Sequence, residues 1–487
     1  MNVSKYDVVV IGSGPAGQKA ALQAAEAGKK TVIIERDRVV GGACVHRGTI
    51  PSKTLRENAL RVREMRKNAS FANFKFAEES ELAILLHRLE RVLQAHDEYM
   101  QRQIERQDID FIHGRAKFLD SQRLEIRKIR KPKQILEAGR IVIATGSIPR
   151  NPPNMAIDHE HVFDSDSVLS MLYLPKSLTV LGGGVIASEY ASIFQALGVQ
   201  VTMIDRYPLP LGFLDDDLTT AFVEVFEQMG GRWAGGSVVA DVHWDGISKV
   251  ICTLDTGEQF ESDKALVAAG RIANIADLCI ENAGLELNDK QLISVDQDLR
   301  TAVPGIYAAG DVIGPPSLAS SSMEQGRRAA CNAFQLETGQ MGSLIPTGIY
   351  AIPELSAVGE NEESAKAKYG DILIGRARFD ETARGQISGA TDGFLKLIAD
   401  SEGRRLLGVM IVGEGATELI HIGQMALIQN EDIDVFVENI FNFPTLAEAY
   451  REAALSVIAQ RNRRMLSPGQ PISDCQAQAA QVPSTSH

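Results

Sequence analysis

The chain has 487 residues, of which 44% are hydrophobic and 23% charged, an ordinary composition for a soluble globular protein that predicts roughly two to four domains. Its formal net charge of −13 argues against a nucleic-acid partner held by electrostatic attraction. No apolar run approaches the roughly 20 residues that span a bilayer, and the first strand is predicted too close to the start for a leader peptide, so we expect a cytoplasmic protein without a membrane partner.

The first chemical motif occupies residues 6–35. An apolar strand, "YDVVVIGSGPAG", runs into Gly12, Gly14 and Gly17, an Ala-rich helical stretch follows, and a second strand ends at Glu35. Glycines at this spacing let the backbone approach a pyrophosphate at a helix N-terminus, and a strand-end acid accepts hydrogen bonds from ribose hydroxyls. We interpret the stretch as a dinucleotide-binding loop rather than as a purely structural turn.

Residues 41–53 read "GGACVHRGTIPSK" and contain a single cysteine, Cys44, with Thr49 five positions later. A hydroxyl cannot form a disulfide, so this segment does not provide a pair of redox-active thiols. The five cysteines of the chain are scattered without the spacing of a zinc site or a disulfide framework, and we predict no metal site. Further on, apolar residues at steps of three and four predict a packed surface helix near 77–106.

The dinucleotide pattern is repeated in residues 178–205. "LTVLGGGVIASEYASIFQALGVQVTMID" contains Gly182, Gly184 and Ala187 and ends at Asp205. Alanine is acceptable in the third position, since that residue only has to permit close packing of helix and strand. Two such loops predict two dinucleotides, which suggests a flavin beside a nicotinamide.

The end of the second loop also bears on nucleotide choice. Asp205 suits the free 2′-hydroxyl of NAD, whereas the adjacent Arg206 can pair with the 2′-phosphate of NADP. We therefore predict a pocket that accepts both nucleotides. The alternative is that Arg206 is a solvated loop charge and another residue meets the phosphate.

Two further strand ends carry small or acidic residues. In "RIVIATGSIPR" a strand runs into a turn with Thr145 and Gly146, and in "GIYAAGDVIG" a strand runs into Gly310 and Asp311, an acid able to bind a ribityl hydroxyl. Either stretch taken alone could be an ordinary strand end. Strands then alternate with helices until a polar tail rich in Pro, Ser and Gln, which predicts disorder.

From residue 5 to about 465, the order and spacing of these motifs resemble the flavoprotein family that includes glutathione reductase and lipoamide dehydrogenase. The resemblance implies an α/β fold with two Rossmann-like dinucleotide-binding domains, one for FAD and one inserted for NAD(P), plus a C-terminal α+β dimerisation domain. It therefore implies a homodimer or a higher homo-oligomer. The expected domains are the first part of the FAD domain at 1–150, the NAD(P) domain at 151–274, the second part of the FAD domain at 275–342, the dimerisation domain at 343–465, and a disordered tail at 466–487.

The resemblance also assigns roles to individual residues. Asp311 corresponds to the acid on the flavin ribityl chain, and Lys53 and Glu189 correspond to the ion pair beside flavin N5, which makes them the candidate catalytic residues. The alternative for this pair is two solvated helix charges. The candidate cofactor contacts are Gly12, Gly14, Gly17, Glu35, Arg36, Cys44, Thr49, Lys53, Thr145, Gly146, Gly182, Gly184, Ala187, Glu189, Asp205, Arg206, Gly270, Arg271, Gly310 and Asp311.

The chain departs from the disulfide reductases of this family at two places. Those enzymes carry a second thiol five residues after the first, and a histidine directly before a Pro-Thr pair with a glutamate five residues after that histidine. Here Thr49 replaces the thiol and Phe443 the histidine, while Glu448 remains. A phenyl ring cannot move a proton, so we expect no disulfide chemistry. Whether Cys44, His46 or Glu448 takes part in chemistry is left open.

Other segments favour a specific reaction. "GTIPSK", "EYASIF", "GDVIGPPSLAS" and "FNFPTLAEAYREAA" resemble the family members that exchange hydride between NADPH and NAD through FAD. The resemblance thus implies FAD as cofactor, with NAD and NADP as substrates. One alternative is an NAD(P)H oxidase, diaphorase or quinone reductase, and another is a nucleotide-sensing protein without catalytic activity.

Overall fold

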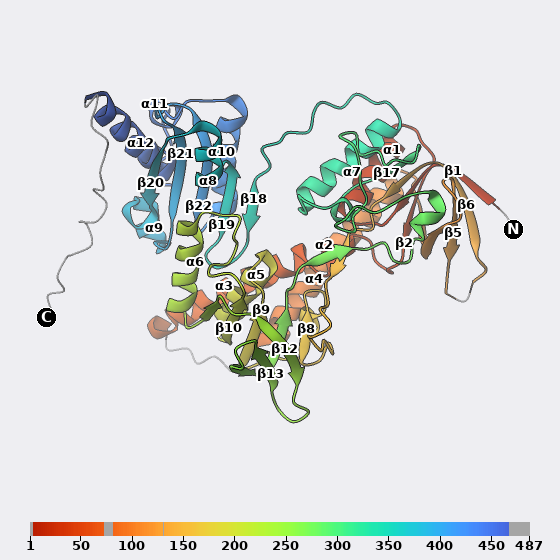
Figure 1. Cartoon of the computed structure of the whole chain (residues 1–487), viewed down its shortest axis with the longest axis horizontal. Helices are drawn as coiled ribbons and strands as arrows, with labels where there is room; N and C mark the ends of the chain where they lie inside the picture. Colours follow the sequence, from red (N-terminus) through yellow and green to blue (C-terminus); the bar gives the residue numbers. More distant parts are fainter. Residues whose placement is uncertain (1–2, 73–80, 130, 467–487) are drawn as a thin grey trace. The chain divides into compact units, whose positions relative to one another are not determined.

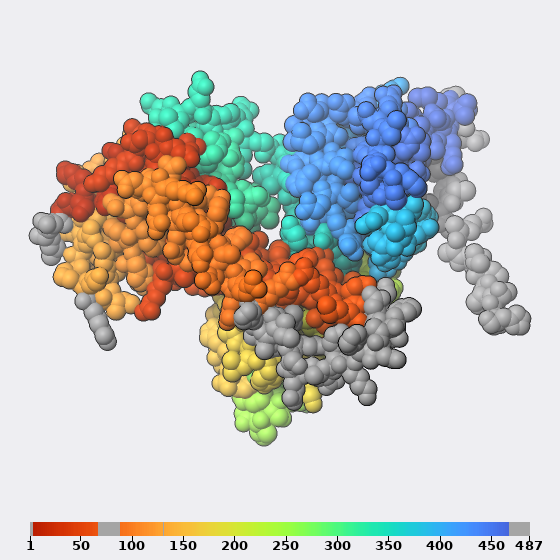
Figure 2. Space-filling view, turned by 180° about the vertical axis from the view of Figure 1, so that it is seen from behind, coloured from red at the N-terminus to blue at the C-terminus, as the bar shows by residue number. Residues whose placement is uncertain are grey.

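The computed structural model describes residues 3–72, 81–129 and 131–466, with side chains for all of these except 67–72 and 81–87. The chain forms two compact units, one made of Met1–Ile345 and Ile349–Pro353, the other of Pro346–Gly348 and Glu354–His487. Figure 1 labels their elements, and the second unit appears in blue in Figure 2. No helix in the described ranges has both the length and the apolar character that a bilayer span requires.

A seven-stranded sheet is the first layer of the first unit. Its order is β3-β2-β1-β6-β5-β4, with β17 also paired to β6. The pairs among β1, β2, β3, β6 and β17 are parallel, whereas β4 and β5 join as antiparallel strands. The strands are β1 (Val3–Ile11), β2 (Thr31–Glu35), β3 (Asp110–His113), β4 (Arg115–Phe118), β5 (Arg123–Arg127), β6 (Gln134–Ile143) and β17 (Ile306–Ala308).

Strand β1 shows why this sheet is buried on both faces. Val8 and Val10 belong to one hydrophobic cluster, and Val9 and Ile11 belong to another, so successive side chains point to opposite sides. The end of β1, from Val8 to Ile11, is apolar and buried at every position, which is typical of a parallel sheet covered on both faces.

Helices α1 and α7 pack closely against one face of this sheet. A Cβ atom added at Gly326 would lie 1.9 Å from the Ala16 carbonyl oxygen, so only glycine allows this approach. The predicted helix near 77–106 is confirmed for 81–106, and residues 77–80 lie outside the described residues. The helical elements of this part of the chain are α1 (Pro15–Glu26), α2 (Gly42–His46), α3 (Thr49–Ala72), α4 (Glu81–Arg106), η3 (Ile280–Ala283), η4 (Asp311–Ile313) and α7 (Ala319–Ala333).

The second sheet of this unit has the order β11-β10-β9-β15-β8, and all its pairs are parallel. An antiparallel sheet of three strands, β12-β13-β14, accompanies it. The elements are β8 (Val162–Asp164), η2 (Val168–Ser170), β9 (Ser177–Leu181), α5 (Val185–Ala196), β10 (Gln200–Asp205), α6 (Asp216–Gln228), β11 (Arg232–Gly235), β12 (Val239–Trp244), β13 (Val250–Leu254), β14 (Gln259–Ser262) and β15 (Lys264–Val267).

Two short strands connect these sheets. The chain leaves the first sheet through β7 (Ser147–Pro149) and returns through β16 (Arg271–Ala273). The two strands pair antiparallel, with Arg271 opposite Pro149 and Ala273 opposite Ser147. The outgoing and returning chains therefore lie side by side.

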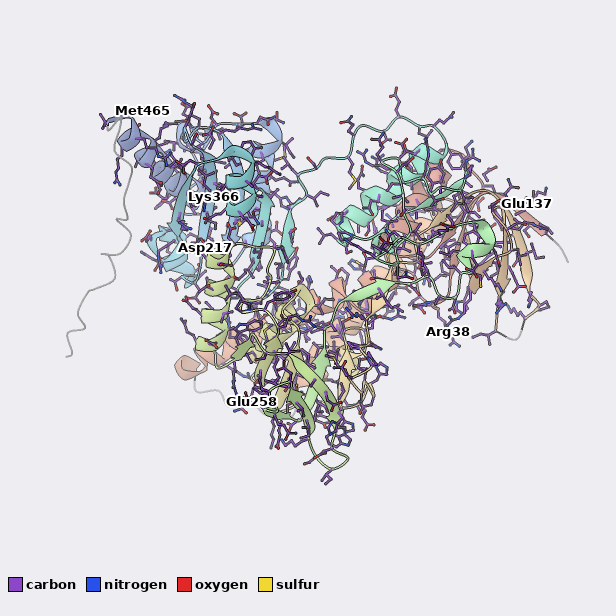
Figure 3. All side chains as sticks on the ribbon, in the orientation of Figure 1. Arg38, Glu137, Asp217, Glu258, Lys366 and Met465 are labelled. Carbon is purple, nitrogen blue, oxygen red and sulfur yellow. The ribbon has the colours of Figure 1, made fainter. Side chains whose placement is uncertain are left out.

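The second unit is built on the sheet β18-β19-β22-β21-β20. On its helix α8, Lys366, labelled in Figure 3, pairs with Glu362 at 3.2 Å. Together with the mostly parallel first sheet and the parallel second sheet of the first unit, this sheet confirms the predicted fold class, while the exact domain boundaries stay a prediction. The elements are β18 (Thr347–Ile349), β19 (Leu355–Gly359), α8 (Glu362–Tyr369), β20 (Ile372–Arg378), η5 (Phe379–Glu381), α9 (Ala383–Ser388), β21 (Phe394–Asp400), β22 (Leu406–Val412), α10 (Ala416–Gln429), α11 (Val435–Glu438) and α12 (Glu448–Leu466). Of the predicted disordered tail at 466–487, Leu466 is instead the last residue of α12, and 467–487 lie outside the described residues.

Candidate functional site

The first glycine loop joins β1 to α1 and contains three glycines with different roles. Gly12 has φ +103°, and a Cβ there would lie 2.3 Å from the Ala144 carbonyl oxygen. A Cβ at Gly17 would lie 1.9 Å from the Gly12 carbonyl oxygen, so the fold itself requires glycine at both positions. At Gly14, by contrast, no atom lies within 4 Å of an added Cβ. The start of α1 therefore presents bare backbone to open space, which fits a phosphate group.

Glu35, at the end of β2, supports this loop. Its side chain is buried, and its Oε2 accepts hydrogen bonds from the Ser13 backbone N–H at 2.8 Å and the Ser13 hydroxyl at 2.7 Å. Its Oε1 accepts from the Asp37 N–H at 2.9 Å. Glu35, which is predicted to accept hydrogen bonds from a ribose, therefore also stabilises the glycine loop. Ser13 was not predicted, because only its folded contacts distinguish it from any other loop serine.

The turn after β6 places Thr145 and Gly146 beside the same loop. The buried Thr145 hydroxyl has no hydrogen-bond partner among the described residues. Asn274 donates to the Thr145 carbonyl through Nδ2 at 3.0 Å and to the Gly146 carbonyl through its backbone N–H at 2.9 Å. Arg36 donates to Asn274 Oδ1 at 3.1 Å. Asn274, which the sequence did not single out, therefore connects two predicted contacts that lie far apart in the chain.

Gly310 and Asp311 follow β17 at the next strand end. Gly310 has φ +82°, and its N–H donates to the Gln325 side chain at 2.9 Å. Asp311 Oδ2 accepts from the Ser147 hydroxyl at 2.7 Å, whereas no hydrogen bond from a described residue reaches Oδ1. One carboxylate oxygen is thus held in place and the other is left as an acceptor.

These strand ends fit an FAD molecule. The open backbone at Gly14 suits the pyrophosphate of FAD. The buried Thr145 hydroxyl has no hydrogen-bond partner among the described residues, and a bound ligand would supply one. Asp311 Oδ1 remains available to accept a hydrogen bond from a ribityl hydroxyl. All three lie at the carboxyl edge of the parallel strands, where open α/β sheets bind their ligands.

Cys44 on α2 faces the hydroxyl that stands where a second thiol would be. Burial raises the pKa of the Cys44 thiol, and a hydrogen bond with Thr49 and the charge of Lys53 offset this only in part. The thiol is therefore held protonated near neutral pH, a poor nucleophile. All cysteines in the described part of the chain are free thiols. His46 Nε2 lies 2.7 Å from the carbonyl oxygen of Val40, so this contact stays within a short segment of the chain.

Lys53 on α3 and Glu189 on α5 form the predicted ion pair. Lys53 Nζ lies 2.7 Å from Glu189 Oε1 and 2.6 Å from Oε2. The Glu189 side chain is 5% exposed and that of Lys53 25% exposed, so the alternative of two solvated charges does not describe this pair. The Tyr350 N–H donates to Glu189 Oε1 at 2.9 Å, and its ring lies 4.8 Å from Lys53 Nζ.

The segment around Tyr350 is fixed by the same two helices. Arg56 Nε donates to the Ala351 carbonyl at 3.0 Å, and the Ile352 N–H donates to the Ser192 hydroxyl at 3.0 Å. The local sequence around Tyr350 does not indicate this support, because it comes from residues of α3 and α5 that are far away in the chain.

The second glycine loop, between β9 and α5, repeats the geometry of the first. Gly182 has φ +122°, and a Cβ there would lie 2.6 Å from the Ala268 carbonyl oxygen. An added Cβ at Gly184 would meet no atom within 4 Å. Ala187 is fully buried, in agreement with its predicted packing position. This loop therefore offers a second open cradle at a helix N-terminus.

Asp205 ends β10 beside that cradle. A Cβ at Gly183 would lie 3.2 Å from Asp205 Cγ and 3.1 Å from the Trp233 ring, so these two side chains wall one side of the loop. Asp205 Oδ1 accepts from the Tyr207 N–H at 2.9 Å. Arg206 is exposed and makes no hydrogen bond or ion pair with any described residue, which leaves its guanidinium available.

The last two predicted contacts lie at the start of the returning strand, and Phe443 and Glu448 lie in the second unit. Gly270 has φ +100° and open space around it, and Arg271 reaches Ser147 and Asp166. In the second unit, Phe443 is 66% exposed, and Glu448 begins α12 with its buried Oε2 lacking a partner among the described residues.

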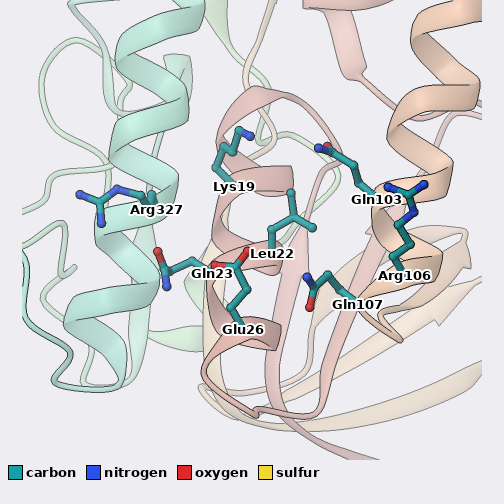
Figure 4. A pocket seen from close by; sticks show the side chains of 8 residues that line it. All are labelled: Lys19, Leu22, Gln23, Glu26, Gln103, Arg106, Gln107 and Arg327. Carbon is teal, nitrogen blue, oxygen red and sulfur yellow. The ribbon is translucent and has the colours of Figure 1, made fainter.

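A separate hollow of about 340 Å³ lies between α1, α4 and α7 of the first unit (Figure 4). Its lining is polar except for Leu22 and contains none of the predicted site residues. Its lining residues are Lys19, Leu22, Gln23, Glu26, Gln103, Arg106, Gln107 and Arg327.

Comparison with known families gives matches over most of the chain. The family described as pyridine nucleotide-disulphide oxidoreductase matches residues 6–326, and its dimerisation domain matches residues 345–454. A soluble pyridine nucleotide transhydrogenase of Mycobacterium bovis (strain BCG / Pasteur 1173P2) is 40% identical over 456 residues, 93% of this chain and 97% of that protein. A protein of the same name from Marinomonas sp. is 40% identical over 459 residues, 94% of this chain and 99% of that protein.

Solved structures give the same architecture. LpdA from Mycobacterium tuberculosis aligns with a TM-score of 0.84 and 27% identity, covering 93% of this chain and 99% of that one. The HOCl-induced flavoprotein disulfide reductase RclA from Escherichia coli aligns with a TM-score of 0.83 and 27% identity, covering 92% of this chain and 99% of that one.

Proposed function

Because the chain belongs to the pyridine nucleotide-disulphide oxidoreductase family, we propose that it is an FAD-dependent transhydrogenase that moves hydride from NADPH to NAD, reversibly and without a redox-active disulfide. Relatives that carry the name transhydrogenase at about 40% identity support this activity. Bound FAD would supply the capacity to accept a hydride from one nicotinamide and give it to the next. The match to the dimerisation domain supports a homodimer.

The residues of the first sheet would hold the flavin cofactor. The Gly14 backbone would receive the pyrophosphate, Glu35 the adenosine ribose, and Asp311 a ribityl hydroxyl. Lys53, fixed by Glu189, would bring a positive charge to the isoalloxazine side of the site. These groups bind and orient, and none of them has to form a covalent bond.

The second sheet would receive both nicotinamide nucleotides in turn. The Gly184 backbone offers a pyrophosphate cradle, and Asp205 would accept from the ribose of NAD. Arg206, which has no partner among the described residues, would pair with the 2′-phosphate of NADP. An acidic residue next to a basic residue would let a single pocket bind both NAD and NADP.

The observation that carries the proposal is Thr49, which stands five residues after the free thiol of Cys44. A hydroxyl occupies the place of the second thiol, and burial raises the pKa of the remaining thiol. This pair cannot cycle between dithiol and disulfide. Hydride that reaches such a site has to leave through another small molecule, and the second dinucleotide cradle favours a nicotinamide.

The test is a transfer assay without oxygen. Purified protein is mixed with NADPH and an NAD analogue whose reduced form absorbs at a distinct wavelength. We expect the analogue to be reduced catalytically, at the same rate with and without oxygen. If NADPH is consumed only when oxygen, a quinone or a dye is present, the protein is an oxidase, diaphorase or quinone reductase, and the transhydrogenase proposal is wrong.

A further inference from the structure

The Arg271 guanidinium occupies the junction of the strands that connect the two parallel sheets. Its Nε donates to the Ser147 hydroxyl at 2.8 Å, and its Nη2 donates to the Ser147 carbonyl at 2.9 Å. Its Nη1 donates to Asp166 Oδ1 at 2.8 Å and to the Ser165 hydroxyl at 3.1 Å. Every nitrogen of the group is thus engaged by the protein.

The hydrogen bonds through Ser147 can run in one direction only. A guanidinium donates and never accepts, so the Ser147 oxygen must accept from Arg271 Nε. A serine hydroxyl has a single proton, which then points to Asp311 Oδ2 at 2.7 Å. The order Arg271, Ser147, Asp311 therefore fixes the rotation of the hydroxyl and of the carboxylate. It leaves Asp311 Oδ1 as the carboxylate oxygen that accepts no hydrogen bond from a described residue.

The opposite side of the guanidinium is held by a rigid turn after β8. Asp164 Oδ1 accepts from the Asp166 and Ser167 backbone N–H groups at 3.0 and 2.8 Å, which sets the position of Asp166. The side chains of Arg271 and Asp166 are 22% and 18% exposed, so solvent screens their ion pair only in part. The guanidinium has little freedom to move away from Ser147.

We propose that Arg271 is a positioning residue that orients Asp311, through Ser147, to bind the flavin ribityl chain. The proposal rests on the FAD-binding function proposed above. It gives Arg271 a role through protein contacts, in agreement with the full use of its nitrogens by Ser147, Ser165 and Asp166. It also explains why a serine directly follows the Thr145-Gly146 turn.

The test measures FAD affinity of the deflavinated full-length protein by fluorescence titration. Ser147→Ala removes the relay, and Arg271→Lys keeps a charge but loses the planar fork. Each variant is expected to raise the Kd for FAD about tenfold to hundredfold, the size of one hydrogen bond to a charged group. The double variant is expected to lose no more than Ser147→Ala alone, since both changes break the same chain of contacts. Ser147→Thr, which keeps the hydroxyl, is expected to retain the affinity.

Control measurements separate this role from general destabilisation. Arg123→Lys weakens another arginine–aspartate pair, that with Asp120 on the outer hairpin, and is expected to leave the Kd for FAD unchanged. Additive losses in the double variant, or an unchanged Kd in Ser147→Ala, would overturn the positioning role. The same holds if Ser147→Thr loses as much affinity as Ser147→Ala. If the wild-type protein itself binds no FAD, the proposed function fails first, and the inference falls with it.

Discussion

Individual side chains decide which chemistry this scaffold can support. Thr49 stands five residues after Cys44, where a dithiol partner would be expected, and burial raises the pKa of that thiol, so the sulfur stays protonated. Phe443 carries no titratable group and is exposed on its own unit. The ion pair of Lys53 and Glu189, by contrast, is intact and mostly buried. The second thiol and the proton-transferring histidine of the disulfide reductases are both replaced, whereas the groups proposed to hold the flavin remain.

Nucleotide selection can be tested at one residue. Arg206→Ala removes the exposed guanidinium next to Asp205. If Arg206 meets the 2′-phosphate, kcat/KM for NADP(H) falls about tenfold to hundredfold, equivalent to roughly 1.5–3 kcal/mol. The value for NAD(H), which lacks the phosphate, should stay nearly constant.

The matched control is Arg102→Ala on α4, an exposed arginine away from the second glycine loop, which should change neither value. Equal losses for both nucleotides in Arg206→Ala, or no loss for either, would show that the phosphate is recognised elsewhere.

At the scale of secondary-structure elements, the two strand–loop–helix units contain two kinds of glycine. Some are required by the packing of the protein itself, and others are required only for binding a ligand. Gly17 lies against backbone, whereas Gly14 and Gly184 face open space with φ values of −67° and −83°. Any residue can adopt those φ values, so the protein itself gives no reason for glycine at these two positions. A pyrophosphate bound at these positions would give such a reason.

Alanine substitutions exploit this difference. Gly14→Ala should leave the melting temperature of the deflavinated protein within a few degrees of wild type, equivalent to about 1 kcal/mol or less. It should nevertheless weaken FAD binding at least tenfold, because the methyl group enters the phosphate cradle. Gly184→Ala should weaken nicotinamide binding and spare FAD, as measured by KM and flavin content.

Gly17→Ala is the opposite control and should lower the melting temperature, because its Cβ would lie 1.9 Å from a carbonyl oxygen. FAD binding by Gly14→Ala with unchanged affinity would refute the assignment of this loop.

The turn before β8 gives a prediction for acid stability. Burial alone would raise the pKa of Asp158, but hydrogen bonds from the Val162, Glu160 and His161 N–H groups and from the His161 ring lower it from 3.8 to about 2. A lowered folded-state pKa adds stability above the unfolded value, and this contribution is lost as the pH falls toward 2. The asparagine side chain of the Asp158→Asn variant does not titrate in this pH range. The melting temperature of wild type should therefore exceed that of Asp158→Asn near neutral pH, and the gap should close between about pH 4 and pH 2. A gap independent of pH would contradict this role.

The elements and the site could be predicted from the sequence to different extents. Both glycine loops were predictable, because strand, turn, helix and strand-end acid follow one another within about 30 residues. Asn274, Ser147 and Tyr350 were not, since each acts on a residue more than 100 positions away and carries no local pattern. The bracing role of Ser13 also depends on a contact that only the folded chain makes.

For the molecule as a whole, the proposed reaction would require the second parallel sheet to bind NADPH and NAD. Within the described residues, the parallel sheets with an open glycine cradle are the two already described, and the first fits FAD. NADPH and NAD would then use the second cradle in turn. Initial-rate kinetics with both substrates varied should give parallel lines, with each nucleotide inhibiting at high concentration. Intersecting lines would indicate a ternary complex and require another nucleotide site.

The measurement that tests the central claim most directly compares wild type with Cys44→Ser in two assays. The first follows anaerobic hydride transfer from NADPH to the NAD analogue, and the second follows reduction of lipoamide and oxidised glutathione. If the exchange needs no thiol, Cys44→Ser keeps most of the transfer rate, and neither protein reduces the disulfides. Loss of transfer in Cys44→Ser, or disulfide reduction by wild type that disappears in this variant, would contradict the account.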